Sequence, residues 1–97
     1  MKTFENKQTS LNTGATTKAR YADLALTVLD QPPERGFTPQ LMDSRTRAVH
    51  AIRDQIDNET IELDDREFDT LREAVAGGRW MTRHDDINDF NRYFENL

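Results

Sequence analysis

The chain has 97 residues, of which 35% are hydrophobic and 32% charged, and its formal net charge is −5 at pH 7. A chain of this length builds at most one domain with a small core, and the absence of cysteine excludes disulfides and thiol chemistry. No stretch approaches the roughly 20 apolar residues of a membrane span, and the N-terminus lacks the apolar region of a secretory signal. We therefore expect no membrane association.

The charge is distributed unevenly along the chain. Residues 1–20 carry four basic side chains against one acidic side chain, a net charge of +3. Residues 54–73 carry nine acidic side chains against two arginines, a net charge of −7. Because charge of this kind steers association more than it determines a fold, the pattern indicates an acidic body with a basic, polar leader and bears mainly on partners.

Residues 1–16 hold four apolar side chains without a sustained period, and they predict a flexible polar N-terminal arm. An alternative is an extended arm that becomes ordered on a partner, with Phe4 and Leu11 as anchors. Seven of the eight aromatic residues lie after residue 20. Residues 17–97 are therefore predicted to form a single small helical domain.

Two helices are predicted in the first half of this domain. Apolar residues at three- and four-residue steps favour a helix over residues 17–30, and the prolines at 32–33 end it. Thr38 is a good N-cap for a second helix, and Pro39 suits its first position because the missing N–H would be unpaired there. This second helix should end near Asp57.

A short strand and a third helix follow. Residues 60–63 alternate between polar and apolar side chains and predict a strand. Asp64 or Asp65 is the expected cap of the third helix, and the glycines at 77–78 end it. Residues 79–81 are the strand partner that we consider for residues 60–63.

A last helix begins at Thr82 or Asp85 and carries its apolar side chains on one side. The predicted fold class is therefore mainly α. It consists of four short amphipathic helices, with room for one small two-stranded β-ribbon formed by residues 60–63 and 79–81.

No motif in the sequence indicates catalysis, a cofactor or a metal. The acidic run that begins at Asp57 does not fit a calcium loop, because its sixth and twelfth positions are Glu62 and Phe68 instead of Gly and Glu. His50 and His84 are not spaced as a ligand pair, and there is no cysteine for zinc. We predict that the protein is not an enzyme and has no catalytic, cofactor-binding or metal-binding residues.

Three kinds of residue are candidates for a protein–protein interface. We favour a core position for Trp80 between the last two helices, and an exposed aromatic anchor is the alternative. The acids on or before the third helix could imitate phosphates, although a solvated helix face is the simpler interpretation. With a pI near 4.9, the body is not expected to bind nucleic acid sequence-specifically. The candidate interface residues are Phe4, Leu11, Trp80, Glu62, Asp69 and Glu73.

From position 20 onward, the order of packing and capping residues is similar to a pattern found in other proteins. The residues concerned are Arg20-Tyr21-Ala22-Asp23-Leu24, Gln31-Pro32-Pro33, Gly36-Phe37-Thr38, Met42, Arg45, Arg47, Ile61-Glu62-Leu63-Asp64-Asp65, Leu71, Arg79-Trp80 and Phe90. In this order the chain resembles small proteins encoded by bacterial viruses and prophages. The resemblance extends over residues 20–97 and implies a viral origin, and it carries no site motif.

Two hypotheses of function follow. The first is a phage-encoded, non-catalytic interaction module, namely a small virion structural or assembly protein that docks on a larger viral or host protein through its N-terminal arm. The alternative is an acidic inhibitor or regulator that mimics nucleic acid and blocks a host nucleic-acid-binding protein. Both hypotheses place the protein in the host cytoplasm or the virion, and both leave the partner and the oligomeric state open.

Overall fold

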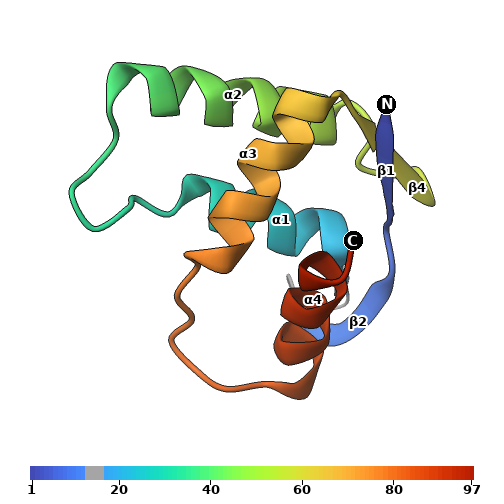
Figure 1. Cartoon of the computed structure of the whole chain (residues 1–97). Helices are drawn as coiled ribbons and strands as arrows, with labels where there is room; N and C mark the ends of the chain where they lie inside the picture. The colour runs from blue at the N-terminus through green and yellow to red at the C-terminus, as the bar shows by residue number, and fades with distance from the viewer. Residues whose placement is uncertain (13–16) are drawn as a thin grey trace.

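The computed structural model describes residues 1–12 and 17–97. These residues form four α-helices and four β-strands (Figure 1). The elements in chain order are β1 (Lys2–Glu5), β2 (Gln8–Asn12), β3 (Lys18–Arg20), α1 (Tyr21–Asp30), α2 (Pro39–Arg53), β4 (Thr60–Leu63), α3 (Asp65–Ala76) and α4 (Asp85–Glu95). None of the helices in the described part of the chain has both the length and the hydropathy that crossing a membrane requires.

The strands form two small antiparallel sheets. β1 pairs with β4 so that Phe4 lies opposite Ile61, and β2 pairs with β3 with an irregular register between Gln8 and Asn12. Figure 1 shows β1 and β4 along one side of the molecule, with β2 leading from β1 toward α4. The first strand thus finds its partner beyond α2, in the second half of the chain.

This architecture is an α+β fold, and the prediction of a mainly α fold with at most one ribbon is wrong. The strand at Thr60–Leu63 is present, but it pairs with Lys2–Glu5 and not with residues 79–81. A physical reason lies in the backbone of Arg79. Its N–H donates to Oε1 of Gln31 at 2.9 Å, and its carbonyl accepts from Nε2 of the same side chain at 2.8 Å.

Residues 2–12 belong to the part of the chain that was predicted to be a flexible arm, and in the structure they are strands packed into the fold. Phe4 is only 1% exposed, and its ring centroid lies 5.2 Å from that of Phe94 in an edge-to-face contact. The buried ring of Phe4 and the backbone pairing with β4 hold β1 in place. Burying a phenylalanine side chain stabilises the fold because it removes a large apolar area from water. Residues 13–16 of the predicted arm lie outside the described residues.

Asn6 connects the segment between β1 and β2 to the rest of the protein by hydrogen bonds. The residue is 3% exposed, and its amide donates to the carbonyls of Ile56 and Asn58 at 3.0 and 2.9 Å. Its Oδ1 accepts from the N–H of Ala22 at 2.8 Å, and its own N–H donates to the carbonyl of Glu59 at 2.9 Å. A buried amide whose donors and acceptor are all paired fixes three segments in one arrangement.

The hydrophobic core lies between the helices and the β1–β4 sheet. In α4, the rings of Phe90 and Phe94 are 5.0 Å apart edge to face, and Tyr21 of α1 packs on Phe90 at 5.2 Å. The remaining large, fully buried side chains come from α1, α2, β4 and α3. They are Val28, Leu29, Ile52, Ile61, Leu63 and Leu71.

The start of α2 and both ends of α3 follow the predicted capping residues. Oγ1 of Thr38 accepts from a backbone N–H of the first turn of α2 at 3.1 Å, and Pro39 is the first residue of that helix. Asp64 and Glu67 form a reciprocal capping box at the start of α3, and Gly77 caps its end. These cap predictions are confirmed because a cap is decided by residues within one turn of each other.

Two other boundaries differ from the prediction. α1 begins at Tyr21 and not near residue 17, since Lys18–Arg20 form β3 and the N–H of Arg20 donates to Oδ2 of Asp23 at 2.8 Å. α2 ends at Arg53, four residues before Asp57. At the first boundary the pairing of β3 with β2 takes residues that the helical period alone would include in α1. After α2, residues 54–57 form turns instead of helix, with the N–H of Gln55 donating to the carbonyl of Ile52 at 3.1 Å.

Candidate interaction surface

The two histidines lie in different elements of the fold. Within residues 1–12 and 17–97, no group of three or more His, Asp or Glu side chains is placed to hold a metal ion. His50 is exposed on α2. His84 is the N-cap of α4, where its Nδ1 accepts from the N–H of Asp86 at 3.1 Å. The geometry thus gives one histidine a surface position and the other a capping position.

The two anchors proposed for the N-terminal arm lie against the protein itself. Phe4 is part of the core, and Leu11 of β2 is half-buried and packs against the core. β2 is also bonded to α4, because the N–H and the hydroxyl of Ser10 donate to Oδ2 of Asp86 at 2.8 and 2.5 Å. These intramolecular contacts occupy the side chains that were expected to reach a partner.

Trp80 lies in the connection between α3 and α4 and is half-buried. Its ring packs edge-on against Phe90 with centroids 6.5 Å apart, and it lies against the core cluster. Its indole N–H is buried and has no hydrogen-bond partner in the described part of the chain. The neighbouring Met81 is fully exposed, with a relative exposure of 101%. The ring therefore covers one end of the core, as we favoured from the sequence.

The acidic residues of the 54–73 segment form the largest charged feature of the structure, which we call the acidic surface. Eight of its nine acidic residues are exposed and Glu67 is half-buried. The acidic surface consists of Asp54, Asp57, Glu59, Glu62, Asp64, Asp65, Glu67, Asp69 and Glu73. These residues extend from the end of α2 through β4 along α3 (Figure 1).

None of these nine carboxylates forms an ion pair within the described residues. The ion pairs between basic and acidic side chains there join Lys7 to Glu5, Arg47 to Asp43 and Arg83 to Asp85. Nδ1 of His84 also lies 4.0 Å from Oδ2 of Asp86, a contact that is ionic only when the imidazole is protonated. Two acids of the segment have a local structural role, since Asp64 and Glu67 make the capping box of α3. The other seven are left for solvent or a partner.

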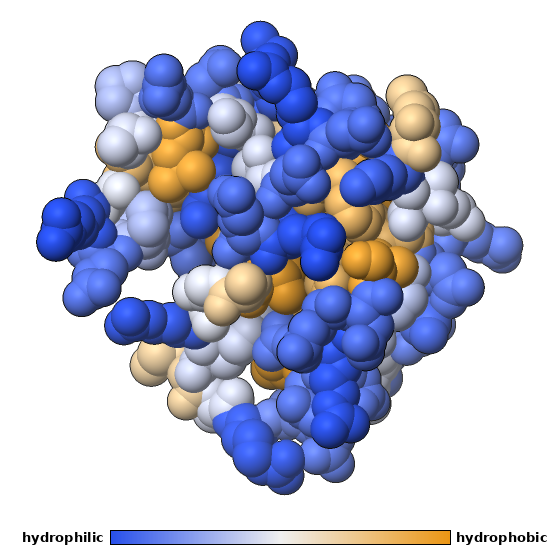
Figure 2. Space-filling view, viewed as in Figure 1, coloured by the Kyte–Doolittle hydropathy of each residue, from blue (hydrophilic) through white to orange (hydrophobic). Residues whose placement is uncertain are grey.

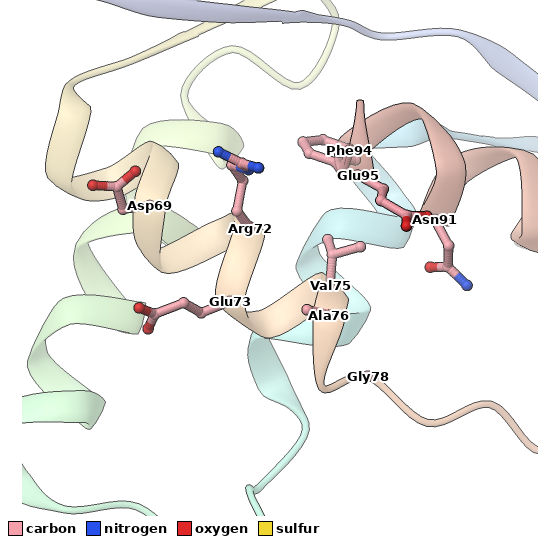
Figure 3. A pocket seen from close by; sticks show the side chains of 9 residues that line it. All are labelled: Asp69, Arg72, Glu73, Val75, Ala76, Gly78, Asn91, Phe94 and Glu95. Carbon is pink, nitrogen blue, oxygen red and sulfur yellow. The ribbon is translucent and has the colours of Figure 1, made fainter. Parts of the chain in front are cut away.

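The three predicted acidic candidates lie on this surface at two places. Glu62 is on β4, and its backbone N–H and carbonyl bond the side chain of Gln55 at 2.8 Å each while its carboxylate stays exposed. Asp69 and Glu73 are four residues apart on α3 and point away from α4 (Figure 3). Glu73 faces Arg45 closely enough to raise the pKa of that guanidinium, although burial is the larger effect and lowers it.

A groove of about 720 Å³ lies between α3 and α4 (Figure 3). Its apolar lining is Val75, Ala76 and Phe94, and Gly78 leaves one end without a side chain. The polar lining residues are Asp69, Arg72, Glu73, Asn91 and Glu95. This volume falls within the range of small-ligand pockets.

The remainder of the visible surface argues against a broad apolar interface. On the face shown in Figure 2, hydrophilic residues cover most of the surface and hydrophobic residues appear in separate patches. Scattered apolar patches of this kind are usual for protein surfaces and do not mark an interface. The charge on α3 and β4 is thus the feature that distinguishes this molecule.

Two titratable residues with shifted pKa values were not predicted from the sequence. The hydrogen bonds from Ser10 lower the pKa of Asp86 below its usual value, and His84 adds to the effect. Burial raises the pKa of Tyr21, and the nearby Asp89 and Asp86 raise it further. Both shifts depend on β2 lying against α4, so no local sequence signal could have shown them.

Comparison of the chain with protein-family models, with curated proteins and with solved structures finds no match. The resemblance to proteins of bacterial viruses therefore stays a prediction. The class that the fold itself defines is a small α+β domain with an acidic helix and strand on its surface.

Proposed function

We propose that the protein is a non-catalytic interaction module that binds a basic protein partner through its acidic surface. The observation that carries this proposal is that nine carboxylates gather in one segment and none of them is neutralised by an ion pair in the described residues. Like charges held close together repel one another and destabilise the compact state. Binding of a basic partner would reduce this repulsion between the carboxylates.

The arrangement of the carboxylates supports electrostatic recognition. Asp69 and Glu73 are separated by four residues of α3, a rise of about 6 Å along the helix axis, and both extend to the same side (Figure 3). Glu62 adds an exposed carboxylate from the adjacent strand. Regularly spaced charges on a rigid support steer a basic partner into one orientation, and they raise the association rate more than the affinity.

The form of the hypothesis in which an N-terminal arm docks on a virion protein receives less support. Phe4 lies in the core and Leu11 packs against it, so neither is presented to a partner. The form in which the protein blocks a nucleic-acid-binding protein is better supported, because the groove of such a partner is itself basic. A viral structural partner with a basic face remains compatible with the same surface.

The test compares two sets of charge reversals with equal change in net charge. One variant carries Glu62→Lys, Asp69→Lys and Glu73→Lys on the acidic surface. The matched control carries Asp30→Lys, Glu34→Lys and Asp89→Lys, three exposed acids outside that surface. Tagged protein is used to capture partners from host cells, and each captured protein is then quantified by mass spectrometry and titrated against all three forms in purified form.

We expect the surface variant to lose the partner by at least tenfold and the control to change binding by less than about threefold, because only the first removes complementary charge. Binding by the natural protein should weaken steeply between 50 and 300 mM salt, as exposed charges are screened over about 10 Å or less. Equal losses in both variants would contradict the proposal. Loss of the partner's nucleic-acid binding in the complex would identify the inhibitor form.

A further inference from the structure

A pocket of about 360 Å³ lies where the start of β2 meets α1 and α4. Its volume is at the lower end of the range for small-ligand pockets, so the occupant that fits it is a small molecule. Polar side chains from all three elements line it, and they include Lys7, Tyr21, Asp86, Asp89, Arg92 and Tyr93.

The hydroxyl group of Tyr21 is a polar group in this pocket without a partner. Tyr21 is 6% exposed, and its ring packs against Phe90 and Tyr93 with centroids 5.2 and 5.4 Å apart. No hydrogen bond joins the hydroxyl to a residue that the structure describes, and its pKa is raised by burial and by nearby charges alone. Two of those charges, Asp89 and Asp86, line the same pocket, so the hydroxyl faces it. The oxygen is not one of the atoms that are both unpaired and inaccessible, so a ligand in the pocket can reach it.

Charges of both signs remain unpaired around this hydroxyl. Asp89 and Arg92 lie three residues apart on α4, are exposed, and form no ion pair within residues 1–12 and 17–97. Of the other charged groups, Asp86 accepts through Oδ2 from β2, and Lys7 forms its ion pair with Glu5 at 3.6 Å. The pocket thus offers one free carboxylate and one free guanidinium, without an excess of either sign.

We propose that this pocket binds a small zwitterion of the α-amino acid type, with its ammonium between Asp89 and the hydroxyl oxygen of Tyr21 and its carboxylate on Arg92. A ligand with a single charge would pair with one of the two charged groups and bring a like charge close to the other. An ammonium has donors for both the carboxylate and the hydroxyl oxygen, and a guanidinium binds a carboxylate through two parallel hydrogen bonds. The inference goes beyond the proposed function, because no residue of the acidic surface lines this pocket.

The first experiment titrates the ¹⁵N-labelled full chain with each standard L-amino acid in turn and follows the amide signals by NMR. We expect at least one of them to give saturable shifts at Gln8, Asp89 and Tyr93, with a dissociation constant of about 1 mM or tighter for a ligand of this size. The N-acetyl derivative of that amino acid lacks the ammonium and its amide derivative lacks the carboxylate, so each should bind at least about tenfold more weakly. Absence of saturable shifts at the pocket with every amino acid, or equal binding of either derivative, would overturn the proposal.

Tyr21→Phe tests the hydroxyl alone, because it keeps the ring that packs on Phe90. The hydroxyl has no partner among the described residues of the free protein, so its removal should not lower the midpoint of urea unfolding. The same substitution should weaken binding of the amino acid about fivefold, since the ammonium loses an acceptor. A lower midpoint would mean that the hydroxyl has a structural partner, and unchanged binding would mean that the ligand does not reach it. Either result contradicts the proposal.

Two neutralising substitutions on α4 distinguish the two ends of the ligand. Asp89→Asn should weaken binding of the amino acid about tenfold and change binding of its N-acetyl derivative less than about twofold, because only the amino acid carries the ammonium. Arg92→Gln should have the corresponding effect on the amino acid and leave the amide derivative unchanged. Glu95→Gln and Arg35→Gln, at exposed positions outside the pocket, are the matched controls and should change binding less than about twofold. Equal effects of the pocket variants and their controls, or equal losses with the amino acid and both derivatives, would refute the assigned orientation and the site.

Discussion

The N-terminal segment and the acidic segment are both polar and charged in sequence, but the first is bonded into the protein and the second has carboxylates without ion pairs in the described residues. Residues 2–12 are bonded into the molecule through Asn6, through Phe4 in the core and through Ser10 on Asp86. Residues 54–73 carry more charge, yet none of their carboxylates forms an ion pair within the described residues. The difference teaches that a polar composition does not distinguish a docked segment from one presented to solvent.

The strongest test of this contrast removes the aromatic anchor of the first segment. Phe4→Ala should lower the free energy of unfolding by about 3–5 kcal/mol, since it leaves a cavity against Phe94 and Ile61. Urea unfolding followed by circular dichroism measures this loss. Met81→Ala, at a fully exposed side chain, is the control and should stay within about 0.5 kcal/mol. A small effect of Phe4→Ala would mean that β1 is not part of the folded core.

The next largest effect is expected at the buried amide of the same segment. Asn6→Ala leaves the carbonyls of Ile56 and Asn58 and the N–H of Ala22 without their partner. We expect a loss of about 2–3 kcal/mol in unfolding free energy, together with faster hydrogen exchange at the Ala22 amide. Asn88→Ala on the exposed side of α4 is the matched control. Equal stability of the two variants would show that the Asn6 hydrogen bonds contribute nothing net.

A smaller, pH-dependent effect is expected where β2 meets α4. Because the pKa of Asp86 is lowered in the folded protein, its contribution to stability is present above the usual value near 3.8 and is lost as the pH falls through the lowered value. Ser10→Ala removes the hydrogen bond from the hydroxyl to Asp86 and keeps the one from the backbone N–H. The free energy of unfolding, measured between roughly pH 6 and pH 2, should thus fall less steeply with decreasing pH in this variant than in the natural protein. Thr46→Ala should keep the natural slope.

The smallest effect on stability is expected in the acidic segment. Glu62→Gln, Asp69→Asn and Glu73→Gln together should change the free energy of unfolding by less than about 1 kcal/mol, because these side chains are exposed and unpaired. Any change should be an increase at low salt, since repulsion is reduced, and it should vanish at high salt. Thermal unfolding at two salt concentrations checks this. A large loss of stability would place these carboxylates in the structure of the domain and not at an interface.

The parts of the fold that the sequence predicted are those decided within a few residues. The cap at Thr38, the capping box at Asp64 and the helix end at Gly77 are set by side chains that bond backbone groups of the adjacent turn. The strand at residues 60–63 was visible from alternation over four positions. The exposed acids of α3 were also visible, because a polar helix face follows from the 3.6-residue period.

The parts that the sequence did not predict depend on contacts between distant segments. One apolar residue in Lys2–Glu5 gives no periodic signal, so the role of Phe4 appears only when Ile61 and Phe94 are brought beside it. Arg45 shows the same limit. Its guanidinium donates to the carbonyl of Gln31 at 2.5 Å, just beyond the end of α1, and this partner lies 14 residues earlier in the chain.

The sequence by itself determined the four helices, most of their ends and the charge that they carry. The tertiary structure decided which polar residues form hydrogen bonds within the protein and which are exposed to solvent. The physical reason is that capping and helical periodicity act over one or two turns. Strand pairing, the burial of Phe4, the hydrogen bonds of Asn6 and the unpaired oxygen of Asn91 depend on distances that exist only after the whole chain has folded.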